Sequence, residues 1–166
     1  MLKFEATITI GALIQGAALL VAALGLAFNA LETRRATRQR RIQQLVDLQH
    51  KFYSDAEMLD AYYLIEYGDF TYDDNFHGSD LEKKIDRLLV HFENIATLFQ
   101  AKVVSLSELD IVAYNYLVIY QNAEIQEYFS WLDEWYEQRG IKEKPFEIFR
   151  AVGAVVEQRR FKLLPA

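Results

Sequence analysis

The stretch Ala6–Leu31, ATITIGALIQGAALLVAALGLAFNAL, decides how the rest of the chain is interpreted. It contains 26 residues without a charged side chain, and about 20 apolar residues suffice to cross the hydrocarbon core of a bilayer as a helix. We therefore predict a transmembrane helix within residues 1–31, after a short N-terminal tail. The alternative is a cleaved signal peptide, but the apolar core of a signal peptide normally has only about 7–15 residues.

The charged residues that flank this segment predict its orientation. Only Lys3 precedes it as a base, whereas five arginines follow within ten residues. By the positive-inside rule, we expect the N-terminus outside and the rest of the chain in the cytoplasm. The same arginines are expected at the membrane surface, where anionic headgroups attract them. They are Arg34, Arg35, Arg38, Arg40 and Arg41.

The net charge of −6 combines a basic N-terminal part with an acidic remainder. Residues 1–41 contain six bases and two acids, a charge of +4, so the other 125 residues have a charge of −10. An acidic body repels the phosphate backbone, and nucleic acid is therefore not expected as a partner. The absence of cysteine excludes disulfides, thiolate metal sites and cysteine nucleophiles.

Small residues recur within the predicted membrane helix. Ala12 and Gly16 form one pair four residues apart, and Ala18 and Ala22 form another. Helices in lipid associate where small residues let their backbones approach closely. These residues predict packing against another membrane helix, in a homo-oligomer or a larger complex. The ordinary abundance of alanine in membrane helices explains them equally well.

Beyond Leu31 the pattern predicts an all-α protein. No proline or glycine interrupts residues 32–54, so a basic helical stalk continues the membrane helix. A cytoplasmic bundle of about five helices is expected over residues 55–166. Capping boxes at Ser54–Glu57 and Ser79–Glu82 mark two helix starts, and Pro145 suits the first turn of the last helix. The clearest apolar stripe at helical spacing consists of Leu81, Ile85, Leu88, Leu89, Phe92, Ile95, Ala96 and Phe99.

Residues 72–82, YDDNFHGSDLE, contain the densest group of possible metal ligands. An EF-hand loop that starts at Asp73 would have His77 at its fifth position and Lys84 at its twelfth, where a bidentate glutamate belongs. The stretch is better explained as a polar loop that leads into a helix. A calcium- or ligand-dependent sensor using residues 73–82 is therefore the third of our functional hypotheses.

No motif for catalysis or cofactor binding is present. The chain lacks HExxH, Glu-x-x-His, GxGxxG, GxSxG and a P-loop, so we expect neither an enzyme nor a cofactor. His91 is expected beside an apolar stripe, with a local hydrogen bond. Among the aromatic residues, Tyr114 falls on a helical stripe, whereas Tyr116 and Trp131 fall off the stripes. Since aromatic residues are enriched at interfaces, the latter two are the candidate partner surface.

Three segments together resemble a family of small bacterial membrane-anchored helical proteins of unknown function. They are the neck RRATRQRRIQQLVDLQHKFY (34–53), the segment IDRLLVHFENIATLFQAKVVSLSELD (85–110) and AEIQEYFSWLDEW (123–135). The resemblance implies a single-pass protein with a helical cytoplasmic domain. Some relatives are suspected membrane components of anti-phage systems, but the family supplies no catalytic or binding residue.

Two functional hypotheses rank above the calcium- or ligand-dependent sensor. The first is a non-enzymatic, membrane-anchored interaction protein, an accessory or assembly subunit whose bundle docks on a protein partner. The second is a self-oligomerising membrane effector or sensor, suggested in phage defence by the resemblance. Membrane lipid is an expected partner in both.

Overall fold

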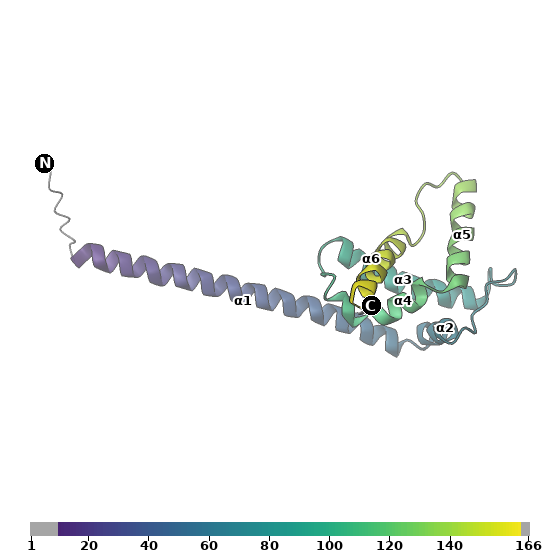
Figure 1. The fold of residues 1–166 in the computed structure, drawn as a ribbon, viewed down its shortest axis with the longest axis horizontal. Coiled ribbons are helices and arrows are strands. Elements are labelled where there is room, and N and C mark those ends of the chain that lie inside the picture. Colours follow the sequence, from purple (N-terminus) through teal and green to yellow (C-terminus); the bar gives the residue numbers. More distant parts are fainter. Residues whose placement is uncertain (1–9, 164–166) are drawn as a thin grey trace. The chain divides into compact units, whose positions relative to one another are not determined.

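The computed structural model describes the backbone of residues 10–163 and the side chains of residues 15–159. Over this range the regular structure is entirely helical, which confirms the all-α prediction. The chain forms two compact units, Met1–Arg40 and Arg41–Ala166. Figure 1 labels the α-helices, which together with the 3₁₀-helix η1 are α1 (Ile10–Ser54), α2 (Ala56–Glu66), α3 (Asp80–Gln100), η1 (Leu109–Ile111), α4 (Ala113–Tyr120), α5 (Ala123–Gln138) and α6 (Glu147–Leu163).

Helix α1 belongs to both units. Its 45 residues contain no proline, and it ends at Ser54. In the first unit, every described side chain of α1 is exposed. In the second unit, Leu45 and Phe52 are buried in the bundle core, while Val46 and Tyr53 remain exposed.

Helix α2 buries Met58, Ala61, Tyr62 and Ile65, the face expected from its sequence. The prediction that Ser54 caps this helix is wrong. Asp55 has the extended backbone of an N-cap residue, and its carboxylate accepts a hydrogen bond from the Met58 N–H at 3.2 Å. Ser54 is instead the last residue of α1. The break between the two helices therefore falls one residue later than expected.

Helix α3 is the centre of the bundle, with α2 and α6 packed against it (Figure 1). Its buried stripe includes Ile85, Leu88, Leu89 and Phe92. Burying each such side chain stabilises the fold by about 1.5–3 kcal/mol. Ser79 caps the helix as predicted, because its hydroxyl accepts a hydrogen bond from the Glu82 N–H at 3.0 Å.

The segment before α4 is not a continuous helix. The 3₁₀-helix η1 comes first, and Val112 interrupts the helix with φ −114° and ψ 0°. The interruption shifts the buried face of α4 by about one residue. Val112, Tyr116 and Ile119 point into the core, at i, i+4 and i+7. Tyr114, expected in the core, is exposed instead.

Helix α6 begins with a cap that comes from another helix. Pro145 lies ahead of its first turn rather than within it, because Phe146 adopts a positive φ of 56° and α6 starts only at Glu147. The Glu93 carboxylate of α3 then accepts a hydrogen bond from the Phe149 N–H at the start of α6. A carboxylate at a helix N-terminus is favourable. This contact joins the two helices end to side.

Candidate functional site

The N-terminal part of α1 is the first candidate functional element. Gln15–Ser54 is, among the described residues, the one helix long and apolar enough to cross a membrane by length and composition, and none of its apolar window is buried inside the protein. A core helix of a soluble protein would have this face covered by its own chain. The large apolar side chains here are between 55% and 72% exposed: Leu19, Leu20, Val21, Leu24, Leu26, Phe28 and Leu31.

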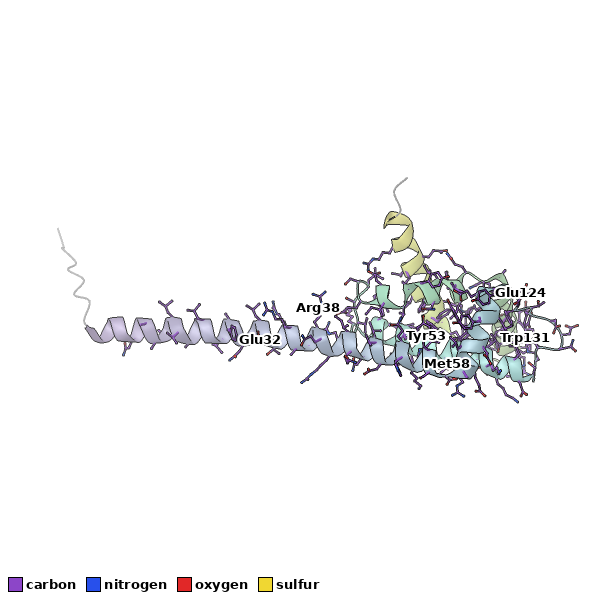
Figure 2. The ribbon with its side chains drawn as sticks, turned by 90° about the horizontal axis from the view of Figure 1, so that it is seen from below. Glu32, Arg38, Tyr53, Met58, Glu124 and Trp131 are labelled. Atoms are coloured by element: carbon purple, nitrogen blue, oxygen red, sulfur yellow. The ribbon has the colours of Figure 1, made fainter. Side chains whose placement is uncertain are left out.

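The five arginines Arg34, Arg35, Arg38, Arg40 and Arg41 form the arginine neck. Arg35 contacts Glu32 at 3.4 Å, and the described side chains form no other ion pair with the neck. Figure 2 shows the Arg38 and Glu32 side chains standing out from α1. The neck therefore offers at least four guanidinium groups to an external anion. Binding to lipid headgroups stays a prediction.

The small residues of α1 meet no packing partner among the described residues. A Cβ atom added to Gly16 would have no neighbour within 4 Å. Ala18 and Ala22 are exposed. Ala12 lies outside the residues whose side chains are described. Helix packing in the membrane therefore also stays a prediction.

The two residues predicted to form a partner surface have different surroundings. Tyr116 is only 1% exposed; its hydroxyl donates to the Phe149 carbonyl at 2.7 Å, and its ring stacks on the Phe149 ring at 4.5 Å. The prediction for Tyr116 is wrong because of the interruption at Val112. Trp131 is half-buried and stacks on the His77 ring with 3.7 Å between the ring centroids.

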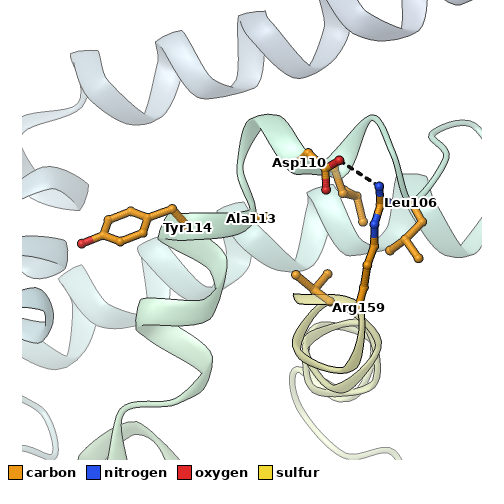
Figure 3. A pocket seen from close by; sticks show the side chains of 7 residues that line it. Leu106, Asp110, Ala113, Tyr114 and Arg159 are labelled. Atoms are coloured by element: carbon orange, nitrogen blue, oxygen red, sulfur yellow. Dashed lines mark hydrogen bonds and ion pairs between the residues drawn. The ribbon is translucent and has the colours of Figure 1, made fainter. Parts of the chain in front are cut away.

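One pocket of about 240 Å³ lies between the η1–α4 segment and α6 (Figure 3). Arg159 and Asp110 form an ion pair at 2.9 Å on one side of it, so both charges are already paired. Pockets for drug-sized ligands are larger, about 300–1,000 Å³, and contain convergent polar groups. The lining residues are Leu106, Leu109, Asp110, Ala113, Tyr114, Val156 and Arg159.

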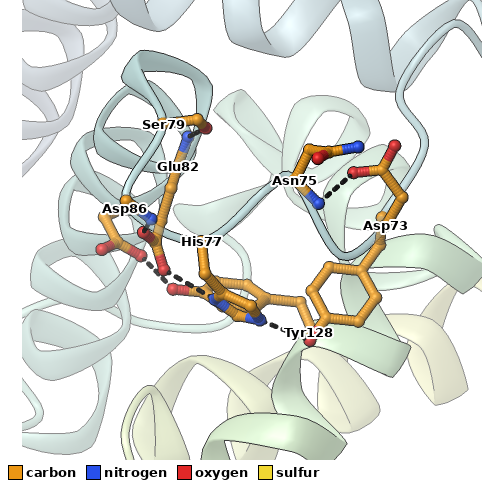
Figure 4. A network of polar contacts seen from close by, with 9 residues as sticks. Asp73, Asn75, His77, Ser79, Glu82, Asp86 and Tyr128 are labelled. Atoms are coloured by element: carbon orange, nitrogen blue, oxygen red, sulfur yellow. Dashed lines mark hydrogen bonds and ion pairs between the residues drawn. The ribbon is translucent and has the colours of Figure 1, made fainter.

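The polar loop after α2 is held by His77 (Figure 4). Its Nδ1 lies 3.1 Å from the Glu82 carboxylate, and its Nε2 lies 2.8 Å from the Tyr72 hydroxyl. A carboxylate can only accept, so Nδ1 donates to Glu82, and Nε2 of the neutral ring accepts from Tyr72. Trp131 covers the ring face. Together these contacts fasten the loop to α3 and α5.

This arrangement favours a structural role for the loop. Burial raises the pKa of Tyr72, aided by Glu127 and Glu82, which keeps the phenol protonated rather than activating it. The Asp73 carboxylate accepts a hydrogen bond from the Asn75 N–H at 2.8 Å. Among the described residues, no group of three or more His, Cys, Asp or Glu side chains converges to hold a metal ion. The loop thus offers calcium no assembled ligand set.

A different group of aromatic residues is exposed in the second unit. Tyr53, Tyr63, Tyr67 and Tyr114 are between 40% and 71% exposed. Glu66 lies beside one of them, because its Oε1 accepts hydrogen bonds from the hydroxyls of the buried Tyr62 and of Tyr114 at 3.1 and 2.9 Å. We call the group of Tyr53, Tyr63, Glu66, Tyr67 and Tyr114 the tyrosine surface.

Members of the tyrosine surface contact one another or a neighbouring residue in α1, α2 and α4. Tyr63 and Tyr67 of α2 stack with 5.6 Å between ring centroids and 10° between ring planes. The Tyr53 hydroxyl of α1 lies 3.4 Å from Oδ1 of Asn115, next to Tyr114 in α4. The spacing of Tyr63 and Tyr67, off the buried stripe of α2, is the one sequence signal that could have identified this surface.

His91 is buried rather than placed at the edge of the core. It is 5% exposed, and its Nε2 has no hydrogen-bond partner among the described residues. Phe52 stacks on its ring. Burial, with a smaller effect of Lys51, lowers the pKa of His91 to about 4. The prediction of a boundary histidine is therefore wrong.

No protein-family model matches this chain, and no curated protein or solved structure matches it. The resemblance to membrane-anchored bacterial proteins accordingly stays a prediction, carried by the segments quoted above.

Proposed function

We propose that this chain is a membrane-anchored interaction protein of the bacterial inner membrane. The N-terminal part of α1 spans the bilayer with its N-terminus outside. The arginine neck lies at the cytoplasmic surface, against lipid headgroups. The helical bundle docks on a protein partner as an accessory or assembly subunit, without catalysing a reaction.

One observation supports the anchor above all: an apolar helix with no cover from the described chain, followed directly by five arginines, four of which form no ion pair with a described side chain. In water this helix would expose a continuous apolar face, which soluble monomers avoid. In a bilayer the same side chains favour insertion, and each arginine near an anionic surface contributes about 1 kcal/mol. The sequence and the burial pattern thus both support a membrane environment for this part of α1.

Docking by the bundle on a protein partner is supported by the exposed tyrosines on its surface. The described residues assemble no metal ligand set, and the pocket beside Arg159 has its charges already paired. The exposed tyrosines, in contrast, have the composition of protein interfaces, where tyrosine supplies large contact area together with a hydroxyl. A binding role uses these features, and a catalytic role uses none of them.

The absence of cysteine gives a direct test of the anchor and its orientation. Lys3→Cys places one thiol before the apolar segment, and Gln100→Cys places one on the exposed end of α3. A membrane-impermeant maleimide should label Lys3→Cys in intact spheroplasts, and Gln100→Cys only after lysis. Recovery of the full-length chain in the soluble fraction would refute the anchor, and the reverse labelling would refute the orientation.

Docking is tested separately by purification from native membranes in mild detergent, with mass determination of the intact assembly. A stable stoichiometric complex with a larger protein is expected. A homo-oligomer without another protein would instead favour the self-oligomerising membrane effector.

A further inference from the structure

We infer that the tyrosine surface binds an arginine-bearing segment of the partner protein. The inference rests on the proposed docking function, and it adds the chemistry of the partner. It is carried by the charges around the tyrosine surface and by the geometry of its rings.

The sequence around α2 is strongly acidic. Residues 52–82 contain nine acids and neither lysine nor arginine. Five of these acids pair with a basic side chain. The pairs are Arg87 with Asp55 and Glu57, Lys84 with Asp60, Lys83 with Asp80, and His77 with Glu82. Glu66 and Asp69, which lie close to the exposed Tyr67 in the sequence, form no ion pair with any described cation.

Glu66 is also turned toward the tyrosines. The hydroxyls of Tyr62 and Tyr114 donate to the same carboxylate oxygen, Oε1, which fixes the orientation of the group. Its Oε2 takes part in no hydrogen bond within the described chain. A partner cation would therefore meet a carboxylate that is already oriented, with little ordering required on binding.

The aromatic rings favour arginine over lysine as that cation. The Tyr67 side chain is 71% exposed, and its stack on Tyr63 leaves a ring face for a planar guanidinium. Guanidinium groups stack on aromatic faces and donate to carboxylates at once, whereas an ammonium is a compact, strongly hydrated point charge. Excess negative charge here opposes anionic lipid and nucleic acid.

The chain itself contains the same combination. Arg150 lies 5.2 Å from the centre of the Phe129 ring while it donates to the Asp133 carboxylate at 2.9 and 3.0 Å. An arginine side chain can therefore satisfy a ring and a carboxylate together within this fold. At the tyrosine surface, the ring and the carboxylate are present and the arginine is supplied by the partner.

The test uses the purified full-length protein in detergent micelles and an alanine-based helical peptide with an arginine at every fourth position. A second peptide has lysine at the same positions. At about 50 mM salt, where exposed charges are only partly screened, we expect the arginine peptide to bind several-fold more tightly. Tyr67→Ala should weaken its binding about three- to fivefold, and Glu66→Gln about tenfold.

Two control variants and a check of the fold make the outcome specific. Glu66→Gln keeps an oxygen for the tyrosine hydroxyls, so the fold is retained, and circular dichroism checks it. Tyr67→Phe should bind like the wild type because the ring face remains. Asp74→Asn removes an exposed charge elsewhere in the acidic segment and should leave the affinity unchanged.

Equal losses in Glu66→Gln and Asp74→Asn, equal affinity for both peptides, or no binding of the arginine peptide would overturn the inference. Dimerisation that Tyr67→Ala abolishes would also overturn it, because the arginine neck of a second copy would then be the occupant.

Failure of the membrane anchor would leave peptide binding unchanged. Failure of peptide binding would leave the fractionation and labelling results unchanged, so the two proposals can fail separately.

Discussion

His91 should make the stability of the bundle depend on pH between neutrality and pH 4. Its imidazole is buried between α1 and α3, with the Phe52 ring stacked on it. Burial and Lys51 favour the neutral ring and lower the pKa of His91 from 6.5 to about 4. In the unfolded chain the pKa returns to its ordinary value, so the unfolded state binds this proton first as the pH falls.

The size of the effect follows from the two pKa values. Stability is unaffected above about pH 6.5, decreases as the pH falls, and levels off once the pH is below the folded pKa of about 4. At pH 4.5 the difference between the folded and unfolded pKa values of His91 lowers the free energy of unfolding by about 2.5 kcal/mol, since each pKa unit corresponds to about 1.36 kcal/mol. This is a large part of the roughly 5–15 kcal/mol that holds a typical domain.

The variant His91→Leu removes the titrating group and keeps an apolar side chain in the core. The chain has two tryptophans, Trp131 and Trp135, both in α5. Their fluorescence therefore reports unfolding of the bundle even while the detergent-embedded part of α1 stays helical. Urea unfolding of the full-length protein at pH 7.5 and pH 4.5 gives the free energies. His50→Gln, which removes an exposed histidine of α1, is the control.

At pH 7.5 we expect His91→Leu to be at least as stable as the wild type. The substitution removes a buried nitrogen without a partner, and such a group costs about 1–3 kcal/mol. At pH 4.5 the wild type and His50→Gln should each have lost about 2.5 kcal/mol more than His91→Leu. Parallel losses in all three proteins would refute the assignment of the acid sensitivity to His91.

Three further predictions concern other contacts. Gly153→Ala should destabilise the bundle by about 1–3 kcal/mol, although alanine favours helices, because the new Cβ would overlap the Tyr120 ring; a Tyr120→Ala background should relieve the loss in urea unfolding. Asp133→Asn should lower the free energy of unfolding by about 1–2 kcal/mol at pH 7, because the hydrogen bond from the Arg150 guanidinium stabilises the Asp133 carboxylate and lowers its pKa. This difference from the wild type should disappear as the pH falls well below the ordinary aspartate pKa of 3.8, and urea unfolding at a series of acidic pH values measures it. Exchanging the whole arginine neck for glutamine should randomise the membrane orientation, so that a fraction of Gln100→Cys becomes labelled in intact spheroplasts.

The helices with a clear apolar stripe were predictable from sequence. The buried face of α2 and the stripe of α3 follow from spacing alone, because a helix brings residues three and four apart to one side. The end of α1 near Tyr53 and the cap at Ser79 also follow from local chemistry. These features need no knowledge of the neighbouring helices, and for that reason the sequence is sufficient.

Features set by one residue of irregular backbone were not predictable. Because Val112 interrupts the helix, Tyr116 is buried and Tyr114 is exposed, the reverse of what the sequence pattern predicted. The positive φ of Phe146 likewise places Pro145 before the start of α6. No residue type in these places signals a break. The burial of His91 has a similar origin, because it depends on Phe52 of α1 packing on α3.

The tyrosine surface combines both cases, and this explains why sequence reasoning placed the partner surface elsewhere. The pair Tyr63 and Tyr67 and the absence of bases near them are visible in the sequence. Their significance depends on Tyr114, which reaches Glu66 across 48 residues of sequence and fixes the orientation of its carboxylate. An acidic helix alone would attract any cation weakly. Rings and an oriented carboxylate brought together by α1, α2 and α4 can instead select arginine, and this selectivity is what the paired peptides measure.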